Sequence, residues 1–475
     1  MRKISLLLVS LLLLTAGYVL AQSAGEDTIG DPFYPGLGNG GYDAQHYTLD
    51  LDVNMRANDI DGVVMMQARA TQALSVFNLD FQGFRIGKIV VDGEPATFER
   101  AGRELSITPA VAIAEGADFS VTVSYAGDPE ANVMGSFSEG WANYGRGVFV
   151  ASEPAGAARW YPVNDHPLDK ATYDLTITVD QPYVVASNGI LMDTITEGDQ
   201  TTYVWRNDEL TASYLVGVYI AEYEVRTDES ASGVPIRNYF PVALADDGEA
   251  TFAAQADMID YFETVFGPYP FKVYGAVVAD TNLSFALEIQ TISLFGRDII
   301  TANTGRRSPD GAQGIIAHEL AHQWFGDSVS LSTWEDIWLN EGFASYAQAL
   351  WIEHTQSVEV RDVMLRNWYA IISNPRLIER GTAAPGSPPR LALFNSSVYL
   401  RGGLTLHALR LAVGDTVFFE ILRTYTARYA YSNVTTADFI ALAEEVSGQP
   451  LADLFQVWLY EDEVPAMPAL DAANP

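Results

Sequence analysis

The hydrophobic periodicity of the chain changes once, near residue 240, and this change constrains the fold more than any other feature. Before it, apolar and polar side chains alternate, as a strand with one solvent-facing side requires. The alternation is clearest in three segments, at 47–53, 119–125 and 173–179. After Pro241, apolar residues recur at helical spacing. The sequence therefore predicts a multidomain α+β chain, with a β domain over 41–240 and a mostly helical domain over 241–466.

Several helices are expected in the second domain. The helical spacing predicts them at 248–266, 312–325, 340–354, 358–373, 400–413 and 435–446. Thr435, with Asp438 three residues later, resembles a capping box, in which two side chains satisfy backbone N–H groups at a helix start. A loop rich in proline and glycine, 374–390, interrupts the helices. A length of 475 residues is consistent with two or three domains.

The two ends of the chain are expected to lie outside these domains. Two basic residues precede an apolar run at 4–14, and small residues up to Ala21 form the pattern of a cleavage site. Residues 1–21 are therefore predicted to be a signal peptide, with a membrane anchor as the alternative. The segment 22–40 is expected to be flexible, and 467–475 is expected to be a polar tail. The mature chain is expected to be secreted or periplasmic, with no stable membrane span.

Composition excludes several classes of function. The chain has 61 Asp and Glu against 27 Lys and Arg, for a net charge of −34, and a surface this acidic repels nucleic acid. It has no cysteine, which excludes disulfides, thiol nucleophiles and metal sites built on cysteine. Any metal site must therefore use histidine, aspartate or glutamate, and the chain has only six histidines.

One segment has the spacing of a metal site. His318 and His322 are four residues apart, so that a helix places both imidazoles on one face, within reach of one ion. Glu319 is offset around that helix, where it can contact a water molecule as general base and later as general acid. Glu341 begins a second helical run and can supply a third ligand. Two histidines and one glutamate leave a fourth position open, which is typical of catalytic zinc. The alternative is a pair of structural histidines beside a solvated glutamate.

The residues around this segment resemble a known family. The sequence HELAHQWFGD at 318–327, followed by WLNEGFASY at 338–346, is similar to the zinc aminopeptidases of the aminopeptidase N and leukotriene-A hydrolase type. RWYPVNDHP at 159–167 resembles the signature of that family's amino-terminal domain, and the resemblance extends over about 40–465. It implies a saddle-like β-sandwich domain packed on a thermolysin-like catalytic domain. The family's C-terminal helical domain, which covers the cleft, has no counterpart here, so the site is expected to be more open.

The resemblance also implies roles for residues outside the metal motif. Tyr399, in a Tyr-Leu-Arg-Gly motif with Arg401 where the family has lysine, matches the tyrosine that stabilises the oxyanion. Glu288, in Phe-Ala-Leu-Glu-Ile, matches the glutamate of a Gly-Ala-Met-Glu-Asn motif that binds the substrate amine. The family's second amine-contact position aligns with Ser152. Because serine is neutral and short, weaker amine selection is expected.

The other candidate polar residues have no partner pattern. We expect four histidines to be structural or exposed: His46, His166, His354 and His407. Two aspartates can either orient the metal-binding imidazoles or act as caps and loop residues: Asp327 and Asp336.

The sequence thus favours an exported aminopeptidase with one zinc per chain, acting on peptides through a zinc-activated water. One alternative is a zinc peptidase with broader or endopeptidase specificity, which Ser152 and the open site favour. The other is a catalytically silent binding protein on the same fold. Self-association, or a partner that covers the cleft, is left open.

Overall fold

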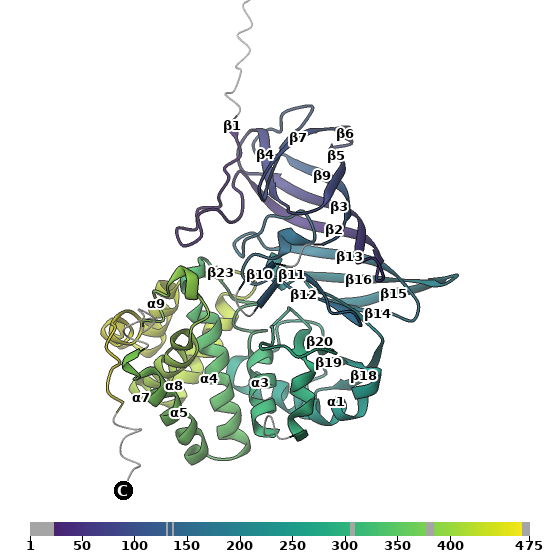
Figure 1. The fold of residues 1–475 in the computed structure, drawn as a ribbon. Helices are drawn as coiled ribbons and strands as arrows, with labels where there is room; N and C mark the ends of the chain where they lie inside the picture. The colour runs from purple at the N-terminus through teal and green to yellow at the C-terminus, as the bar shows by residue number, and fades with distance from the viewer. Residues whose placement is uncertain (1–22, 130–131, 135–136, 305–308, 377–383, 468–475) are drawn as a thin grey trace, which may run out of the picture.

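The structure is a computed structural model that describes residues 23–129, 132–134, 137–304, 309–376 and 384–467. The predicted signal peptide lies outside the described residues, as does the tail from 468 onward. Figure 1 shows a β-rich domain above a helical domain, with a smaller sheet between the helices and the β domain. Among the described residues, none of the helices has both the length and the apolar character that crossing a bilayer needs.

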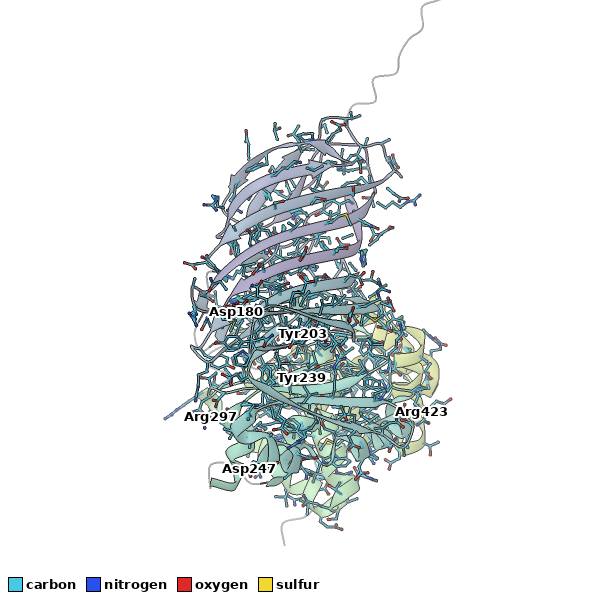
Figure 2. All side chains as sticks on the ribbon, turned by 90° about the vertical axis from the view of Figure 1, so that its right-hand side faces the viewer. Asp180, Tyr203, Tyr239, Asp247, Arg297 and Arg423 are labelled. Carbon is cyan, nitrogen blue, oxygen red and sulfur yellow. The ribbon has the colours of Figure 1, made fainter. Side chains whose placement is uncertain are left out.

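The predicted alternation is confirmed in the largest sheet of the β domain. Its eight strands, in spatial order, are β15 (Ile190–Glu197), β16 (Gln200–Thr211), β13 (Ala171–Asp180), β2 (Tyr42–Asn54), β3 (Asp59–Ala70), β9 (Asp118–Gly127), β5 (Arg85–Val91) and β6 (Glu94–Pro95). β2 and β13 pair in parallel, with Leu49 opposite Leu175 and Leu51 opposite Ile177. All four of these side chains are buried. Figure 2 shows the long strands of this sheet crossing the upper half of the molecule.

Two smaller sheets complete the β domain. The first contains β1 (Ser23–Ala24), β4 (Leu74–Asp80), β8 (Glu104–Thr108) and β7 (Thr97–Ala101). The second contains β10 (Asn132–Met134), β11 (Phe137–Asn143), β12 (Gly147–Ala151), β17 (Val218–Ala221) and β14 (Val184–Ser187). One hydrophobic core joins these sheets and includes Val277 and Leu294 of the next sheet.

The second domain combines one mixed sheet with helices. The sheet contains β18 (Tyr223–Glu229), β19 (Pro235–Pro241), β20 (Tyr274–Ala279) and β21 (Ser293–Gly296). A short parallel pair is formed by β22 (Ser330–Leu331) and β23 (Asn433–Val434). The domain boundary near residue 240 remains a prediction. If each strand is assigned to a domain by the sheet it belongs to, the boundary lies before Tyr223. β18 pairs with β19 and β19 with β20, and neither pairs with a strand of the β domain.

The described helices follow the expected order, with a few differences. They are α1 (Ala245–Phe252), α2 (Gln255–Phe266), α3 (Pro309–Ala321), α4 (Trp338–Thr355), α5 (Val358–Ile372), α7 (Gly402–Val413), α8 (Asp415–Arg428), α9 (Thr436–Ser447) and α10 (Ala452–Phe455). The run expected at 248–266 is two helices, α3 ends earlier than expected, and two helices were not predicted, α8 and α10. The capping box of Thr435 and Asp438 is present at the start of α9.

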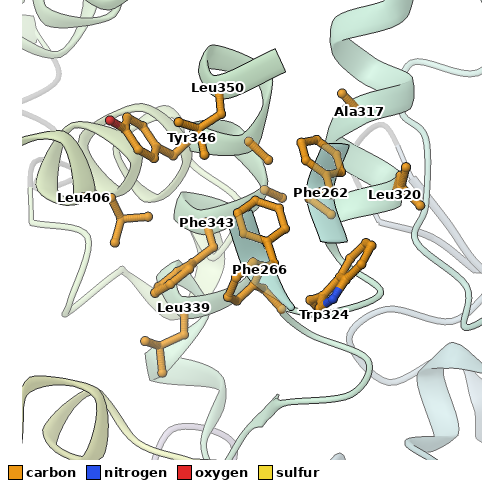
Figure 3. Packing of buried hydrophobic residues seen from close by; sticks show 14 of the residues in the cluster. Phe262, Phe266, Ala317, Leu320, Trp324, Leu339, Phe343, Tyr346, Leu350 and Leu406 are labelled. Atoms are coloured by element: carbon orange, nitrogen blue, oxygen red, sulfur yellow. The ribbon is translucent and has the colours of Figure 1, made fainter. Parts of the chain in front are cut away.

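An aromatic core holds α3 and α4 in position. Trp324 and Phe325 follow α3 and pack on Phe266 of α2, with ring centroids 5.8 and 4.9 Å away. Phe343 of α4 closes the cluster, 4.7 Å from Phe325 (Figure 3). Phe343 lies two residues after Glu341, and Trp324 lies two residues after His322. Packing of these large side chains therefore fixes the relative position of the two segments that carry the metal motif.

The segment expected to be flexible, 22–40, is instead fastened to both domains in its described part. The buried Asp31 carboxylate accepts hydrogen bonds from the backbone N–H of Phe33 and Trp334, at 2.7 and 3.2 Å. It also accepts one from Nε2 of His166, at 3.1 Å. Further along, the backbone N–H of Asn39 donates to Asn164 at 2.6 Å. The glycine-rich composition suggested mobility, but long-range polar contacts that composition does not reveal hold the segment in place.

Candidate active site

The three predicted metal ligands converge. Nε2 of His318 and Nε2 of His322 lie 3.0 and 3.5 Å from the same carboxylate oxygen of Glu341. One ligand atom from each residue lies within 4.8 Å of the other two, and all three residues are buried. α3 supplies His318, α4 supplies Glu341, and His322 stands in the turn just after α3. In that turn the backbone N–H groups of Gln323 and Trp324 donate to the carbonyls of Leu320 and Ala321, three residues earlier, so α3 ends before the expected residue 325. Gly326, with a φ of +131°, then redirects the chain.

Hydrogen bonding and charge prepare these residues for a cation. The imidazole of His322 donates from Nδ1 to the Phe325 carbonyl at 3.1 Å, which leaves the lone pair of Nε2 facing Glu341. Burial lowers the pKa of His318, which favours the neutral form that binds metal. Burial also opposes ionisation of His322, but the carboxylates of Glu288 and Glu341 outweigh it and raise the pKa of His322 well above its usual value, so they favour a positive charge at this position. Burial opposes ionisation of Glu341, but His322 and His318 outweigh it and lower its pKa to about 2. The site thus presents two imidazole nitrogens and a carboxylate.

This donor set fits zinc. Zinc binds neutral imidazole and carboxylate at about 2.0–2.2 Å, and three protein ligands leave one coordination position for chemistry. All three residues line a cavity of about 1160 Å³, so the open coordination position faces this cavity. The arrangement therefore has the features of a catalytic rather than a structural metal centre.

Glu319 lies beside the ligands without joining them. Its carboxylate belongs to a second buried group with Glu288 and His322, in which the ligand atoms again lie within 4.8 Å of one another. Burial raises the pKa of Glu319 well above its usual value, and the charges of Glu288 and Glu341 add to this, although His322 opposes it. A carboxylate in this position can take a proton from a water molecule near the ligands.

Tyr399 faces the metal ligands from a different segment of the chain. Its ring stacks on His318, with centroids 6.0 Å apart. It stands on a π-helical turn, Ser397–Arg401, immediately before α7. Burial, with Glu341 nearby, raises the pKa of Tyr399 well above its usual value, so that the hydroxyl keeps its proton and can donate. The hydroxyl is thus available to an oxyanion formed at the site.

Arg401, which stands where the family has lysine, points away from the site. Its buried guanidinium donates to the carbonyls of Val457 and Glu461, at 2.8 and 2.7 Å. Arg401 thus connects the start of α7 to the segment that follows α10. Because these hydrogen bonds hold the backbone next to Tyr399, the change from lysine to arginine does not disturb the position of Tyr399.

Replacing Tyr399 with phenylalanine tests the role of the hydroxyl. We expect kcat to fall by about 10²-fold with little change in substrate binding, because one donor to the developing oxyanion is lost. Steady-state kinetics on Tyr399→Phe and on the neighbouring Tyr346→Phe, whose hydroxyl contacts His407 instead, measure the difference. A change confined to KM would show that Tyr399 does not act on the transition state.

Two carboxylates that do not belong to the metal motif also face the cavity. Glu288 lies in an extended segment held by a single antiparallel bridge between Leu287 and Leu294. Its Oε1 is buried and has no hydrogen-bond partner among the residues that the structure describes. Glu153 also lines the cavity, and within the same described ranges its buried Oε1 has no partner either. Burial raises the pKa of both residues, and for Glu153 the charges of Glu288 and Glu341 raise it further.

Glu153 was missed by the sequence alignment, which placed the second amine-contact position at Ser152. Ala151 and Glu153 line the cavity, whereas the buried Ser152 between them does not. In extended backbone, neighbouring side chains point to opposite sides, so an error of one residue exchanges the facing residue for the hidden one. β12 ends at Ala151 and Glu153 lies in the turn that follows, so the available signal was a carboxylate next to the predicted position. The expected weakness in amine selection, inferred from Ser152, is therefore not supported.

The four other histidines lie away from the cavity, as expected. His46 contacts Thr172, His166 contacts Asp31, His354 stacks on Tyr261 and His407 contacts Tyr346.

Neither candidate aspartate bonds an imidazole of the metal site. Asp336 accepts from the hydroxyl of Thr436 at 2.6 Å, next to the start of α9. Both carboxylate oxygens of Asp327 are buried without a hydrogen-bond partner in the described structure, and its backbone carbonyl accepts from Lys170 at 3.0 Å. For His322, the Phe325 carbonyl takes the orienting role expected of these aspartates.

The fold and this site together define a metallopeptidase-type catalytic centre on a β domain and a helical domain. Comparison with family models identifies the family. Residues 250–458 match the peptidase family M1 domain, and residues 43–215 match the peptidase M1 N-terminal domain. The chain belongs to the peptidase M1 family, and zinc is its cofactor.

Solved structures show the same two-domain arrangement. An M1 zinc metallopeptidase from Deinococcus radiodurans, crystallised as a glutamate-to-alanine mutant bound to a Tyr-Ser-Ala substrate, has a TM-score of 0.83 and 29% identity. The match covers 93% of this chain and 99% of that one. A mutant of a two-domain M1 zinc metallopeptidase bound to L-arginine has a TM-score of 0.81 and 28% identity, with the same coverage.

Curated relatives are longer proteins. Aminopeptidase M1 of Arabidopsis thaliana is 28% identical over 329 residues, which is 67% of this chain and 37% of that protein. The probable M1 family aminopeptidase 1 of Encephalitozoon cuniculi is 25% identical over 460 residues, or 90% of this chain and 52% of that protein. The chain thus spans between about a third and a half of the length of these relatives.

Proposed function

We propose that this protein is an exported, zinc-dependent aminopeptidase that removes single residues from the amino termini of peptides. The observation that carries the proposal is the distance between the metal ligands and an unpaired carboxylate. A ligand-type oxygen of Glu288 lies within 4.8 Å of the carboxylate of Glu319 and of the metal-binding nitrogen of His322. One extended residue spans about 3.3 Å. Only one residue therefore fits between an amine at Glu288 and a carbonyl beside the metal ligands.

The charges around the site support this assignment. Four carboxylates line one cavity: Glu153, Glu288, Glu319 and Glu341. Burial and neighbouring carboxylates raise the pKa of the first three, whereas His322 and His318 outweigh burial and lower the pKa of Glu341. Such a cluster is stable when cations neutralise it. A zinc ion at the histidine ligands and a substrate ammonium between Glu153 and Glu288 provide this neutralisation.

The residues then divide the chemistry. Bound zinc supplies Lewis acidity, which activates water and polarises a carbonyl. Glu319 removes a proton from the attacking water and later delivers it to the departing amine. The Tyr399 hydroxyl donates to the oxygen that becomes negative in the tetrahedral transition state. Glu153 and Glu288 orient the substrate through its ammonium group.

Two alternatives are less well supported. An endopeptidase needs room for several residues on the amino-terminal side of the cleaved bond, and Glu288 and Glu153 limit that side. A silent binding protein would not require a complete set of ligands, a general base and an oxyanion donor around one cavity.

Export is proposed on the sequence of residues 1–21, with its basic start and its apolar run at 4–14. Amino-terminal sequencing of the mature protein should begin at Gln22, and a mature protein that retains Met1 would contradict this proposal.

Amine recognition can be tested with matched free and acetylated peptides. We expect the wild type to prefer free-amino peptides by about 10²-fold or more in kcat/KM, because each charged hydrogen bond contributes about 1.5–3 kcal/mol. Glu288→Gln and Glu153→Gln should each lower the preference by about tenfold. Glu420→Gln, an exposed glutamate on α8, is the matched control and should leave the preference unchanged. Equal rates for free and acetylated peptides in the wild type would favour the endopeptidase alternative.

A further inference from the structure

The active-site cavity has one wall built by the segment 31–39, which precedes the region matching the family's N-terminal domain. Tyr34 and Leu37 of this segment line the cavity. Asp31 fastens the segment to both domains through His166 and the backbone N–H of Trp334, as described above. The wall is therefore held by buried polar contacts and has a defined position relative to the metal ligands.

This wall positions the guanidinium of Arg390, which also lines the cavity. Nη2 of Arg390 donates to the Pro32 carbonyl at 2.6 Å, and the guanidinium lies 5.8 Å from the ring centroid of Phe33. The Tyr34 hydroxyl donates to the backbone carbonyl of Arg390 at 2.8 Å. Three consecutive residues of the segment thus hold one arginine of the loop that precedes Tyr399.

Arg390 differs from Arg103, a second arginine that lines the cavity, in whether carboxylates pair with its guanidinium. Arg103 is held by two buried carboxylates, Asp80 at 2.8 Å and Asp165 at 3.1 Å. Within the described parts of the chain, no carboxylate forms an ion pair with Arg390. A guanidinium carries five N–H donors, and one carbonyl accepts from Arg390. In a chain with a net charge of −34, Arg390 is thus a positioned cation whose remaining donors are open to an anion.

The position of Arg390 relative to the metal ligands suggests which anion. Tyr399, nine residues after Arg390, stacks on His318, whereas Glu288 lies beside His322. Arg390 lines the same cavity as the two histidines, Glu288 and Tyr399. A peptide whose ammonium is held at Glu288 extends past the ligands toward the carboxyl-terminal side of the cleaved bond. A short peptide ends there in a carboxylate, the group that guanidinium binds in a bidentate manner.

We propose that Arg390, positioned by Pro32, Phe33 and Tyr34, binds the free C-terminal carboxylate of short peptide substrates. The protein then acts on oligopeptides by reading both of their ends, with carboxylates for the ammonium and Arg390 for the terminal carboxylate. This inference rests on the proposed aminopeptidase function and narrows its substrates to short peptides with a free C-terminus.

The test uses peptides of two to six residues with the same first residue, each prepared as the free acid and as the C-terminal amide. For the wild-type zinc enzyme, the ratio of kcat/KM for acid over amide should reach about tenfold at one chain length and decline for longer peptides. The ratio should also fall with added salt, because an exposed charge pair is screened. A ratio near one at every length would overturn the proposal, even if amide peptides were cleaved.

Variants test whether Arg390 causes the preference for acid over amide peptides. Arg390→Gln should bring the ratio to about one while leaving kcat/KM for amides within about twofold, and Arg390→Lys should retain part of the ratio. Tyr34→Phe should lower the ratio without abolishing it. Arg423→Gln is the matched control, an arginine on α8 that also donates to a single backbone carbonyl, that of Thr264, and is not among the residues that line the cavity. Figure 2 shows Arg423 at the edge of the helical domain. Arg159 is the third arginine that lines the cavity. An unchanged ratio in Arg390→Gln, or a ratio lost only in Arg159→Gln, would assign the carboxylate to another arginine and overturn the proposal.

A binding measurement separates this inference from the proposed function. Calorimetry on the Glu319→Gln variant gives Kd for acid and amide peptides without turnover. A tenfold preference for acids that Arg390→Gln removes would support the carboxylate site even if the wild type cleaved no peptide. Equal Kd values for acids and amides would overturn it even if the wild type were an aminopeptidase.

Discussion

Replacing Glu341 with alanine is expected to leave the purified chain without zinc and without measurable peptidase activity. Glu341 is the contact shared by both imidazoles, at 3.0 Å from His318 and 3.5 Å from His322. Without it, two histidines remain on one side of the ion, with no anion to complete the ligand set. Because the metal provides the Lewis acid for the reaction, its loss should remove most of a rate enhancement that is at least about 10⁶-fold for a typical enzyme.

The measurement is metal content by elemental analysis alongside activity, for wild type, Glu341→Ala and His354→Ala. Wild type should hold about one zinc per chain. His354 lies on the same helix as Glu341 but stacks on Tyr261 outside the cavity, so His354→Ala should keep both zinc and activity. Stoichiometric zinc in Glu341→Ala would show that the metal is bound elsewhere.

Glu319→Gln is expected to have the second-largest effect on activity. Unlike Glu341→Ala, it should reduce kcat without removing the metal. The variant should retain its zinc, because Glu319 is not one of the three converging ligands. Its kcat should fall by about 10³–10⁴-fold, the upper range for loss of a general base that also returns the proton. The amide is nearly isosteric with the carboxylate, so the buried position should remain filled. Substrate binding should therefore change little.

Zinc content, Kd for a peptide and single-turnover rates together test this prediction. Glu319→Asp serves as a comparison, since it keeps the carboxylate but moves it back by one methylene, and it should retain more activity than Glu319→Gln. If Glu319→Gln lost zinc together with activity, Glu319 would be part of the metal site and the assignment of the general base would be wrong.

Local patterns determined much of this protein in advance. The alternation at 47–53 and 173–179 predicted buried strand faces, and β2 and β13 pair with those residues in register. The four-residue spacing of His318 and His322 predicted one shared ion, because helical geometry relates such positions without reference to the rest of the chain. Glu341, at the start of the next helical run, could be proposed only as a carboxylate that a second helix brings to the same ion. These features depend on periods of two and 3.6 residues, which the sequence displays directly.

Other features were decided only by packing between distant segments. Whether Ser152 or Glu153 faces the cavity depends on the exact orientation of the backbone after β12, and a one-residue error reverses it. The course of the chain after α3 depends on the positive φ of Gly326 and on an aromatic cluster drawn from α2, α4 and the turn between them. The placement of Arg390 depends on a segment more than 350 positions earlier in the chain, tied down by Asp31. Contacts between residues this far apart in sequence depend on the whole fold. The local sequence around a residue does not indicate which distant residue will pack against it.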